Sequence, residues 1–240
     1  MRKSGAIKIA PLFLCTMKKF LLKIYYSFLS LYDRGRYKTK IFLRSIKVWF
    51  SGFFVDKKPD YDKISKCKRL VVCAHPDDET IFFFSVLRKD TYVVCLSNCG
   101  EKTRRREFFR AIDDLKIHGV MFNAPDIKNA QWMWSKFFLK RRFEKIKNVL
   151  REDCEIYTHS IIGESGHPHH YAVGKFIKGY FKDFKVSYTA EKAEYANELT
   201  EDFLEKKTYI MTNIYSSQIK MLTRWCPWYD GYMKRDSFLK

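Results

Sequence analysis

A short apolar run that ends in a histidine and three carboxylates constrains this chain more than any other feature. Residues 70–74 read Leu-Val-Val-Cys-Ala, and residues 75–79 continue without a break as His-Pro-Asp-Asp-Glu. Five consecutive apolar residues suit a strand that is buried on both faces of a parallel sheet. Acidic residues after a proline are typical of a helix start, where carboxylates accept hydrogen bonds from free backbone N–H groups. The segment therefore predicts a strand that turns directly into a helix.

Short apolar runs continue to alternate with amphipathic stretches toward the C-terminus. This alternation predicts an α/β fold over residues 67–240: a Rossmann-like, mainly parallel sheet with helices on both faces. In such sheets, binding sites form beyond the carboxyl ends of the strands. The expected strands cover residues 70–74, 92–96, 120–122, 155–158 and 186–188, and the expected helices cover residues 79–88, 103–118, 137–150, 171–182 and 191–207.

A second polar segment, residues 163–170, follows the strand expected at 155–158 and reads Gly-Glu-Ser-Gly-His-Pro-His-His. Imidazole and carboxylate groups at two strand ends of one sheet predict a metal site, and they suit zinc or another divalent metal. Taken singly, the first segment is better explained as a helix cap and the second as a solvated loop, but together they favour a site. Five of the six histidines lie in or beside the two segments: His75, His159, His167, His169 and His170.

These segments resemble the motifs of a known family. Residues 74–79, Ala-His-Pro-Asp-Asp-Glu, match the signature of the PIG-L/LmbE-like zinc-dependent N-acetylglucosaminyl de-N-acetylases, and residues 167–170 match their second motif, His-x-x-His. Arg104-x-x-Glu107 is similar to the helix between the two motifs, and residues 215–218 are a weaker echo of the same family. The resemblance runs from about residue 69 to residue 174, and the first 66 residues have no counterpart in it.

The resemblance implies a role for each motif residue. His75, Asp78 and His170 would hold the metal, which leaves a fourth position for water. Asp77 would be the general base that takes a proton from this water. His167 would stabilise the negative charge on the reacting carbonyl oxygen and assist the departure of the amine.

Three further residues are expected to contact the substrate: Arg104, Asp126 and His159. For Arg104 and Asp126, a surface ion pair or a cap is an equally good interpretation, and His159 is also a candidate to support a metal ligand from behind. His169 lies between the two motif histidines of its helix, and we expect it to point away from the site.

The function implied is a zinc-dependent hydrolase that removes the acetyl group from an N-acetylated sugar of the N-acetylglucosamine type, carried on a lipid or a nucleotide. The alternative is a catalytically inactive module that binds a membrane surface, phosphate or nucleic acid. No nucleic-acid reader motif is present, so nucleic acid is not the expected partner.

The positive charge of the chain is concentrated at its beginning. Residues 1–69 hold 18 Lys and Arg against 4 Asp and Glu, whereas the remaining residues hold 28 against 23. Residues 1–66 also carry apolar and aromatic residues at helical spacing, which predicts a basic, amphipathic, helical extension. Such helices bind anionic membrane surfaces, although packing on the sheet is an equally good interpretation.

Seven cysteines, an odd number without a CxxC pair, indicate free thiols in a reducing compartment. The expected location is therefore the cytoplasm, with peripheral attachment to the inner face of the membrane.

Overall fold

The computed structural model describes residues 35–48, 58–127, 139–161, 166–187, 195–219 and 235–239. The chain forms two compact units, residues 1–44 and 45–240. In the first unit, residues 35–44 are helical. The second unit contains all the strands described below, together with the helices that pack on them.

Seven strands form one sheet, in the order β3-β2-β1-β4-β5-β7-β6. The five strands from β3 to β5 pair in parallel, and β7 and β6 extend the sheet in antiparallel pairing. The mainly parallel α/β sheet that the sequence predicts is therefore confirmed. The strands are β1 (Arg69–Cys73), β2 (Thr91–Ser97), β3 (His118–Ala124), β4 (Glu155–Thr158), β5 (Lys185–Ser187), β6 (Tyr195–Glu198) and β7 (Arg235–Leu239).

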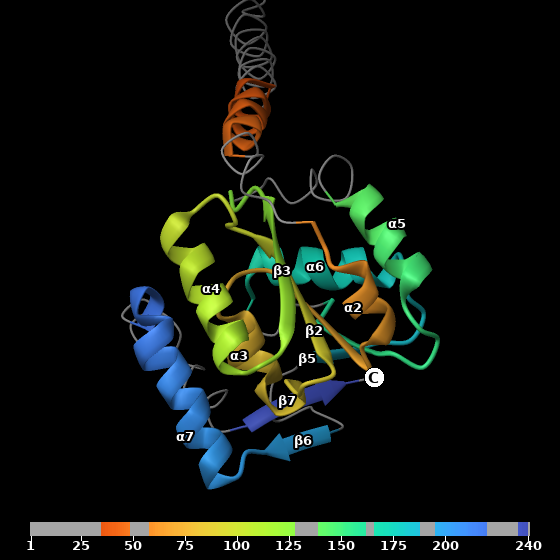
Figure 1. Ribbon diagram of the computed structural model, residues 1–240. Helices are drawn as coiled ribbons and strands as arrows, with labels where there is room; N and C mark the ends of the chain where they lie inside the picture. The colour runs from red at the N-terminus through yellow and green to blue at the C-terminus, as the bar shows by residue number, and fades with distance from the viewer. Residues whose placement is uncertain are drawn as a thin grey trace, which may run out of the picture. The chain divides into compact units, whose positions relative to one another are not determined.

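Helices cover both faces of the sheet, because successive residues of a strand point to opposite sides. Val71 and Cys73 of β1 belong to one apolar core with residues of α3, α4 and η4, whereas Leu70 and Val72 belong to a second core with residues of α2, α5 and α6. Figure 1 shows the two groups of helices around the sheet. The helical elements are α2 (Tyr61–Lys66), α3 (Asp78–Phe83), η1 (Phe84–Val86), α4 (Lys102–Asp114), α5 (Lys140–Val149), α6 (Pro168–Lys178), α7 (Glu201–Tyr209) and the π-helical turn η4 (Ile210–Ile214).

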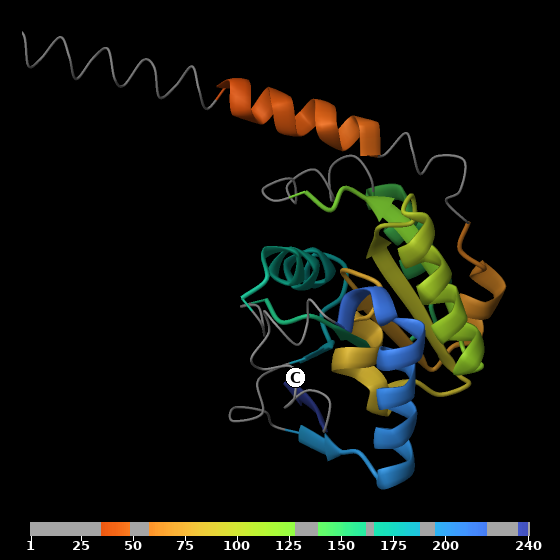
Figure 2. The same ribbon diagram turned by 90° about the vertical axis from the view of Figure 1, so that its left-hand side faces the viewer.

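The helix expected over residues 191–207 is wrong at its described beginning. Residues 195–198 form β6, which pairs antiparallel with β7, and Figure 2 shows β6 running into α7 at this edge of the sheet. Local helix propensity is a weak preference that tertiary pairing overrides. The partner strand begins at residue 235, so no local pattern around residue 195 contains the signal.

The helix expected over residues 103–118 ends earlier than predicted, at Asp114. Lys116 adopts φ 53°, its N–H donates to the carbonyl of Asp113, and the N–H of Ile117 donates to the carbonyl of Ile112. This pair of bonds is the usual helix-ending motif with a left-handed residue, a position that glycine commonly occupies. Because lysine occupies this position, the sequence carries no glycine signal for the end of the helix. His118 is the first residue of β3 and not the last residue of the helix.

Much of the predicted N-terminal extension lies outside the described residues. Within it, α2 packs on the sheet unit, with Ile64 fully buried in the core that α5 and α6 share. The predicted boundary between residues 66 and 67 stays a prediction. Across the described ranges, no helix combines the length and hydropathy that a membrane crossing requires.

The parallel strands β1, β3 and β4 end at the same edge of the sheet, and the helix α6 is packed closely over this edge. A Cβ atom at Gly174 of α6 would lie only 2.4 Å from the carbonyl oxygen of His159, the residue that follows β4. Because glycine has no Cβ, the helix can approach the strand ends and bring its first turn to the segment after β1.

Candidate metal centre and active site

The turn between β1 and α3 directs two adjacent aspartates to different partners. Asp77 adopts φ 106° directly before α3, an unusual conformation for a residue with a side chain. Its carbonyl accepts hydrogen bonds from the N–H groups of Thr80 and Ile81 at 2.9 Å, so it begins the helix. The Oδ2 of Asp78 accepts from the N–H of His75 at 2.8 Å. This bond folds the turn back on itself and holds Asp78 beside His75.

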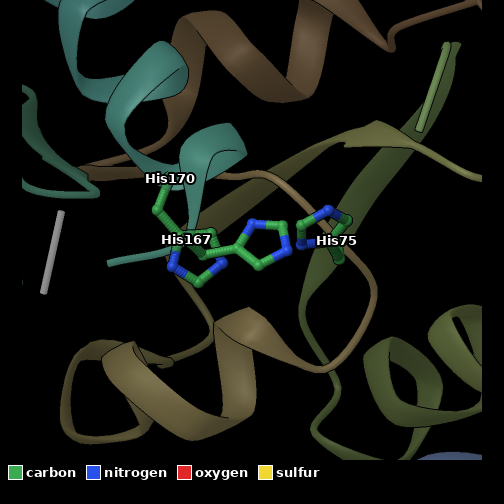
Figure 3. A group of neighbouring side chains, drawn as sticks. All are labelled: His75, His167 and His170. Atoms are coloured by element: carbon green, nitrogen blue, oxygen red, sulfur yellow. The ribbon is translucent and has the colours of Figure 1, made fainter. Parts of the chain in front are cut away.

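The first turn of α6 brings the second group of histidines. His167 caps the helix, and Pro168 follows at its first position, where proline is well tolerated. His167 is exposed, whereas His170, one turn further along, is buried. Figure 3 shows the rings of His75, His167 and His170 gathered together, and the ring centroid of His167 lies 4.9 Å from each of the other two.

The structure brings the three predicted metal ligands together around Asp78. Its Oδ2 lies 3.3 Å from His75 Nδ1, and its Oδ1 lies 3.3 Å from His170 Nε2. In the described part of the chain, three overlapping sets of side chains have ligand atoms within 4.8 Å of one another: His75 with His167 and His170, Asp78 with His159 and His170, and His75 with Asp126 and His169. Neutral imidazole nitrogens with one or two carboxylates are the donors that zinc prefers, so the residues present fit this metal.

Asp77, the predicted base, pairs with Arg104. Its Oδ2 lies 3.2 Å from Nη2 of Arg104, which also donates to the carbonyl of Pro76. Burial raises the pKa of Asp77 to about 6, although the Arg104 guanidinium partly opposes the rise. Arg104 itself is buried and also lies 3.7 Å from Glu107. The structure therefore places this expected substrate contact behind Asp77.

His159 lies beneath the predicted metal ligands and is fully buried. Its Nε2 lies 3.2 Å from Asp78 Oδ2 and accepts a hydrogen bond from the N–H of Ala74 at 3.2 Å. The ring stacks on His170 with a centroid distance of 3.9 Å. His159 therefore lies behind two of the predicted ligands, and its role in supporting them stays a prediction.

The expectation that His169 points away from the site is wrong. Its Nδ1 lies 3.0 Å from His75 Nε2 and 3.0 Å from Oδ1 of Asp126, which follows β3. The first turn of α6 lies against the segment after β3, so the residue between the two motif histidines faces that segment and is 3% exposed. Only the contact between distant segments decides this direction, and the sequence holds no local signal for it.

A buried glutamate and a distant tyrosine complete the site without having been expected. Glu79 accepts from the N–H of Asp77 at 3.1 Å and from the hydroxyl of Tyr215 at 2.5 Å, and both side chains are fully buried. Burial raises the pKa of Glu79 to about 7. Nearby, the hydroxyl of Ser217 donates to Glu107 at 2.7 Å. The weak family echo at residues 215–218 was the available signal for these two links.

The carboxylates create a negative field around His75. Burial lowers the pKa of His75, but Asp126 and Asp78 outweigh this effect and raise it to about 10. Burial opposes ionisation of Asp78, yet His170 and His159 hold its pKa well below the ordinary value. A field that favours a positive charge at His75 also favours a bound cation. Although the residue His167 is exposed as a whole, its ring lies against the other histidines, and the resulting loss of hydration together with their charges lowers its pKa to about 3.

The sequence is similar to those of known proteins. The profile of the family GlcNAc-PI de-N-acetylase, PIG-L, matches residues 70–181. "Uncharacterized protein L374" of Acanthamoeba polyphaga mimivirus is 27% identical over 132 residues, a match that covers 47% of this chain and 57% of the viral protein. The chain thus spans little more than half the length of that relative.

Two solved structures share the fold. The A40926 pseudoaglycone deacetylase Dbv21 has a TM-score of 0.52 at 14% identity, over 70% of this chain and 88% of its own. The zinc-inhibited form of teicoplanin deacetylase Orf2 has a TM-score of 0.50 at 13% identity, over 65% of this chain and 86% of its own. At these identities, the likeness concerns the architecture of the chain.

Proposed function

Because the chain belongs to the PIG-L (LmbE-like) de-N-acetylase family, we propose that it is a zinc-dependent hydrolase that removes the acetyl group from an N-acetylated sugar. The observation that carries the proposal is the convergence of His75, Asp78 and His170 from two strand ends, with the buried carboxylate of Asp77 beside them. An amide is unreactive, so its hydrolysis needs an activated water and stabilisation of the negative charge on the carbonyl oxygen.

His75, Asp78 and His170 would hold the metal. When bound, zinc lowers the pKa of a bound water to about 7 and polarises a carbonyl oxygen. Asp78 would be the central ligand, because its two oxygens face one histidine each. His159 supports Asp78 and His170 from the buried side and so limits the movement of both.

Asp77 and His167 would act on the substrate. With a pKa of about 6, Asp77 is mostly ionised at neutral pH and can take the proton of the attacking water. His167 has a lowered pKa and is therefore neutral, so its N–H can donate a hydrogen bond to the carbonyl oxygen. The leaving amine then receives its proton from Asp77, which held it after the first step.

The substrate we propose is an N-acetylglucosamine unit on a lipid or nucleotide carrier, in keeping with the family. The test is acetate release by the full-length chain from free, nucleotide-linked and lipid-linked N-acetylglucosamine, with bound zinc measured in parallel. His170→Ala should lose both zinc and activity, because two remaining ligands hold the ion poorly. Full zinc occupancy in a folded His75→Ala/His170→Ala double variant contradicts the ligand assignment.

The second candidate is a catalytically inactive binding module. The present arrangement favours an enzyme, because Asp77, Asp78 and the three motif histidines are all in place. Zinc binding without acetate release from any of the three substrate types would favour the inactive module.

We also propose that residues 1–66 attach the protein to an anionic membrane surface on the cytoplasmic side. On the helix over residues 35–48, Tyr37 and Leu43 are 51% and 61% exposed, and basic residues lie between them in the sequence. Exposed apolar side chains beside lysine and arginine suit an anionic interface. Full-length protein should float with anionic vesicles, and less so at high salt. Absence of flotation at low salt contradicts the attachment.

A further inference from the structure

His75 has partners on both edges of its ring. Nδ1 lies 3.3 Å from Asp78 Oδ2, on the side of the other ligands. Nε2, on the opposite edge, lies 3.0 Å from His169 Nδ1 and 3.5 Å from Asp126 Oδ1. The last two atoms are themselves 3.0 Å apart. Neither His169 nor Asp126 is needed to complete the ligand set proposed above, so their position around Nε2 calls for a separate explanation.

We propose that Asp126 and His169 are positioning residues that fix the orientation and the tautomer of His75. A neutral imidazole carries one N–H and one lone pair, and only the lone pair binds a metal. An acceptor beside Nε2 keeps the proton on that nitrogen and leaves the lone pair of Nδ1 directed at the ligand site. The inference rests on the proposed function in one respect, namely that His75 binds the metal.

The fold holds both positioning residues from behind. His169 lies in the first turn of α6, and its Nε2 is 3.4 Å from the carbonyl oxygen of Ile127. Asp126 Oδ2 accepts from the side-chain amide of Asn98 at 3.2 Å, which leaves Oδ1 turned toward the two histidines. Since α6, the segment after β3 and the segment after β2 each contribute a contact, the orientation of His75 depends on the packed sheet edge.

His75, Asp126 and His169 also have ligand atoms close enough together to hold a second metal ion. Two ions present at once would require His75 to bind through both nitrogens and to lose its remaining proton. A single ion held through Nδ1 avoids this loss, because the proton on Nε2 then has acceptors in place. We therefore assign Asp126 and His169 to the support of His75.

The test measures the zinc dissociation constant of the full-length chain by competition with a chelator. His169→Phe removes one of the two polar partners of Nε2 and should raise this constant about 10- to 100-fold, the usual effect of losing a partner behind a metal ligand. His169→Asn should recover most of the affinity, because its amide keeps a polar group, with both a donor and an acceptor, beside His75 and Asp126. Asp126→Asn removes the charge and should weaken zinc binding in the same direction.

A second readout separates orientation from general damage. The visible absorption of the Co²⁺-loaded protein reports the geometry of the ligands and should change in His169→Phe, while the melting temperature of the metal-free protein reports the fold. His118→Phe is the matched control, because His118 is exposed at the start of β3 and should leave the Co²⁺ spectrum and the zinc affinity as they are.

Unchanged zinc affinity and Co²⁺ spectrum in folded His169→Phe would overturn the inference, as would His169→Asn binding as weakly as His169→Phe. If His169→Phe does not fold, the test depends on Asp126→Asn. A zinc dissociation constant of Asp126→Asn equal to that of the wild type would then overturn the inference. A wild-type chain that binds no zinc contradicts the proposed function as well, so the two failures are distinguishable.

Discussion

At the scale of single residues, two neighbouring aspartates differ only in what they face. Asp78 contacts His75, His159 and His170, whereas Asp77 contacts Arg104. The positive φ of Asp77 turns the backbone between them, and this turn separates the two side chains. Two residues of one type, adjacent in the chain, can therefore serve as base and as ligand because their surroundings differ.

The two aspartates should respond differently to the same substitution. Asp77→Asn keeps the shape but removes the basic group, so zinc content should stay near normal while acetate release falls by a factor on the order of 10² or more. Asp78→Asn weakens the central ligand and should lose zinc. Metal analysis and an acetate assay on both variants check this. Zinc loss in Asp77→Asn, with zinc retained in Asp78→Asn, would mean that the roles are reversed.

Arg104 should set the acidic limit of activity. The reaction needs ionised Asp77, so the rate should fall as the pH drops through the pKa of this group, which is about 6. Arg104 lowers that pKa, so Arg104→Met should raise it and shift the acidic limb of the kcat/KM profile to higher pH. Arg104→Lys keeps the charge and is the control. An acidic limb that stays in place in Arg104→Met would contradict the role of this charge.

At the scale of elements, the position of α6 controls the site. This helix supplies His167 and His170, and it approaches the segment after β4 so closely that only glycine fits at residue 174. The neighbouring Val173 and Ile177 are fully buried in the core beneath the helix. The predicted metal ligands from two distant segments therefore meet because the apolar face of α6 is buried in this core.

Gly174→Ala should destabilise the protein and damage the site together. The added methyl group would meet backbone atoms of the segment after β4, and overpacking of this kind costs about 1–3 kcal/mol. Urea unfolding measures the loss, and zinc affinity shows whether α6 has moved. Gly35→Ala is the control, because nothing lies within 4 Å of a Cβ placed there. Equal stability of the two variants would show that α6 can shift without cost.

At the scale of the whole molecule, residues far apart in sequence support the motif after β1. The Tyr215 hydroxyl reaches Glu79 across 136 residues of chain, and Glu79 in turn accepts from the N–H of Asp77. Lys207 adds a similar link, because its Nζ donates to the carbonyl of Ile81 at 2.8 Å. The segment that follows β6 thus holds α3 and the strained Asp77 in place.

Tyr215→Phe tests this long-range support. It removes one hydrogen bond from a buried carboxylate, which should reduce the free energy of unfolding by about 1–3 kcal/mol. Acetate release should also fall, because the backbone of Asp77 loses an indirect restraint, whereas zinc content should change little. Tyr171→Phe, at an exposed position on α6, is the control. If Tyr215→Phe unfolds at the same urea concentration as the wild type, the hydrogen bond between Tyr215 and Glu79 does not stabilise the fold.

Much of this arrangement follows from local sequence. The apolar run at residues 70–74 and its polar continuation predict a buried strand and the start of a helix, and β1 and α3 occupy these positions. The α/β alternation follows in the same way, because burial on both faces demands apolar runs and amphipathic helices show their own period. The residue types at the strand ends also indicate a metal site.

Tertiary structure alone decided the rest. Whether His169 points outward or toward His75 depends on where α6 meets the segment after β3, and residues 195–198 become a strand because β7 lies beside them. The carboxyl of Asp77 has a raised pKa because the folded chain buries it, and the partner that limits this rise is 27 positions away at Arg104. The local sequence pattern indicates which side chains can be buried or can bind a metal. The local pattern does not indicate which distant segments come into contact when the sheet and its helices pack together.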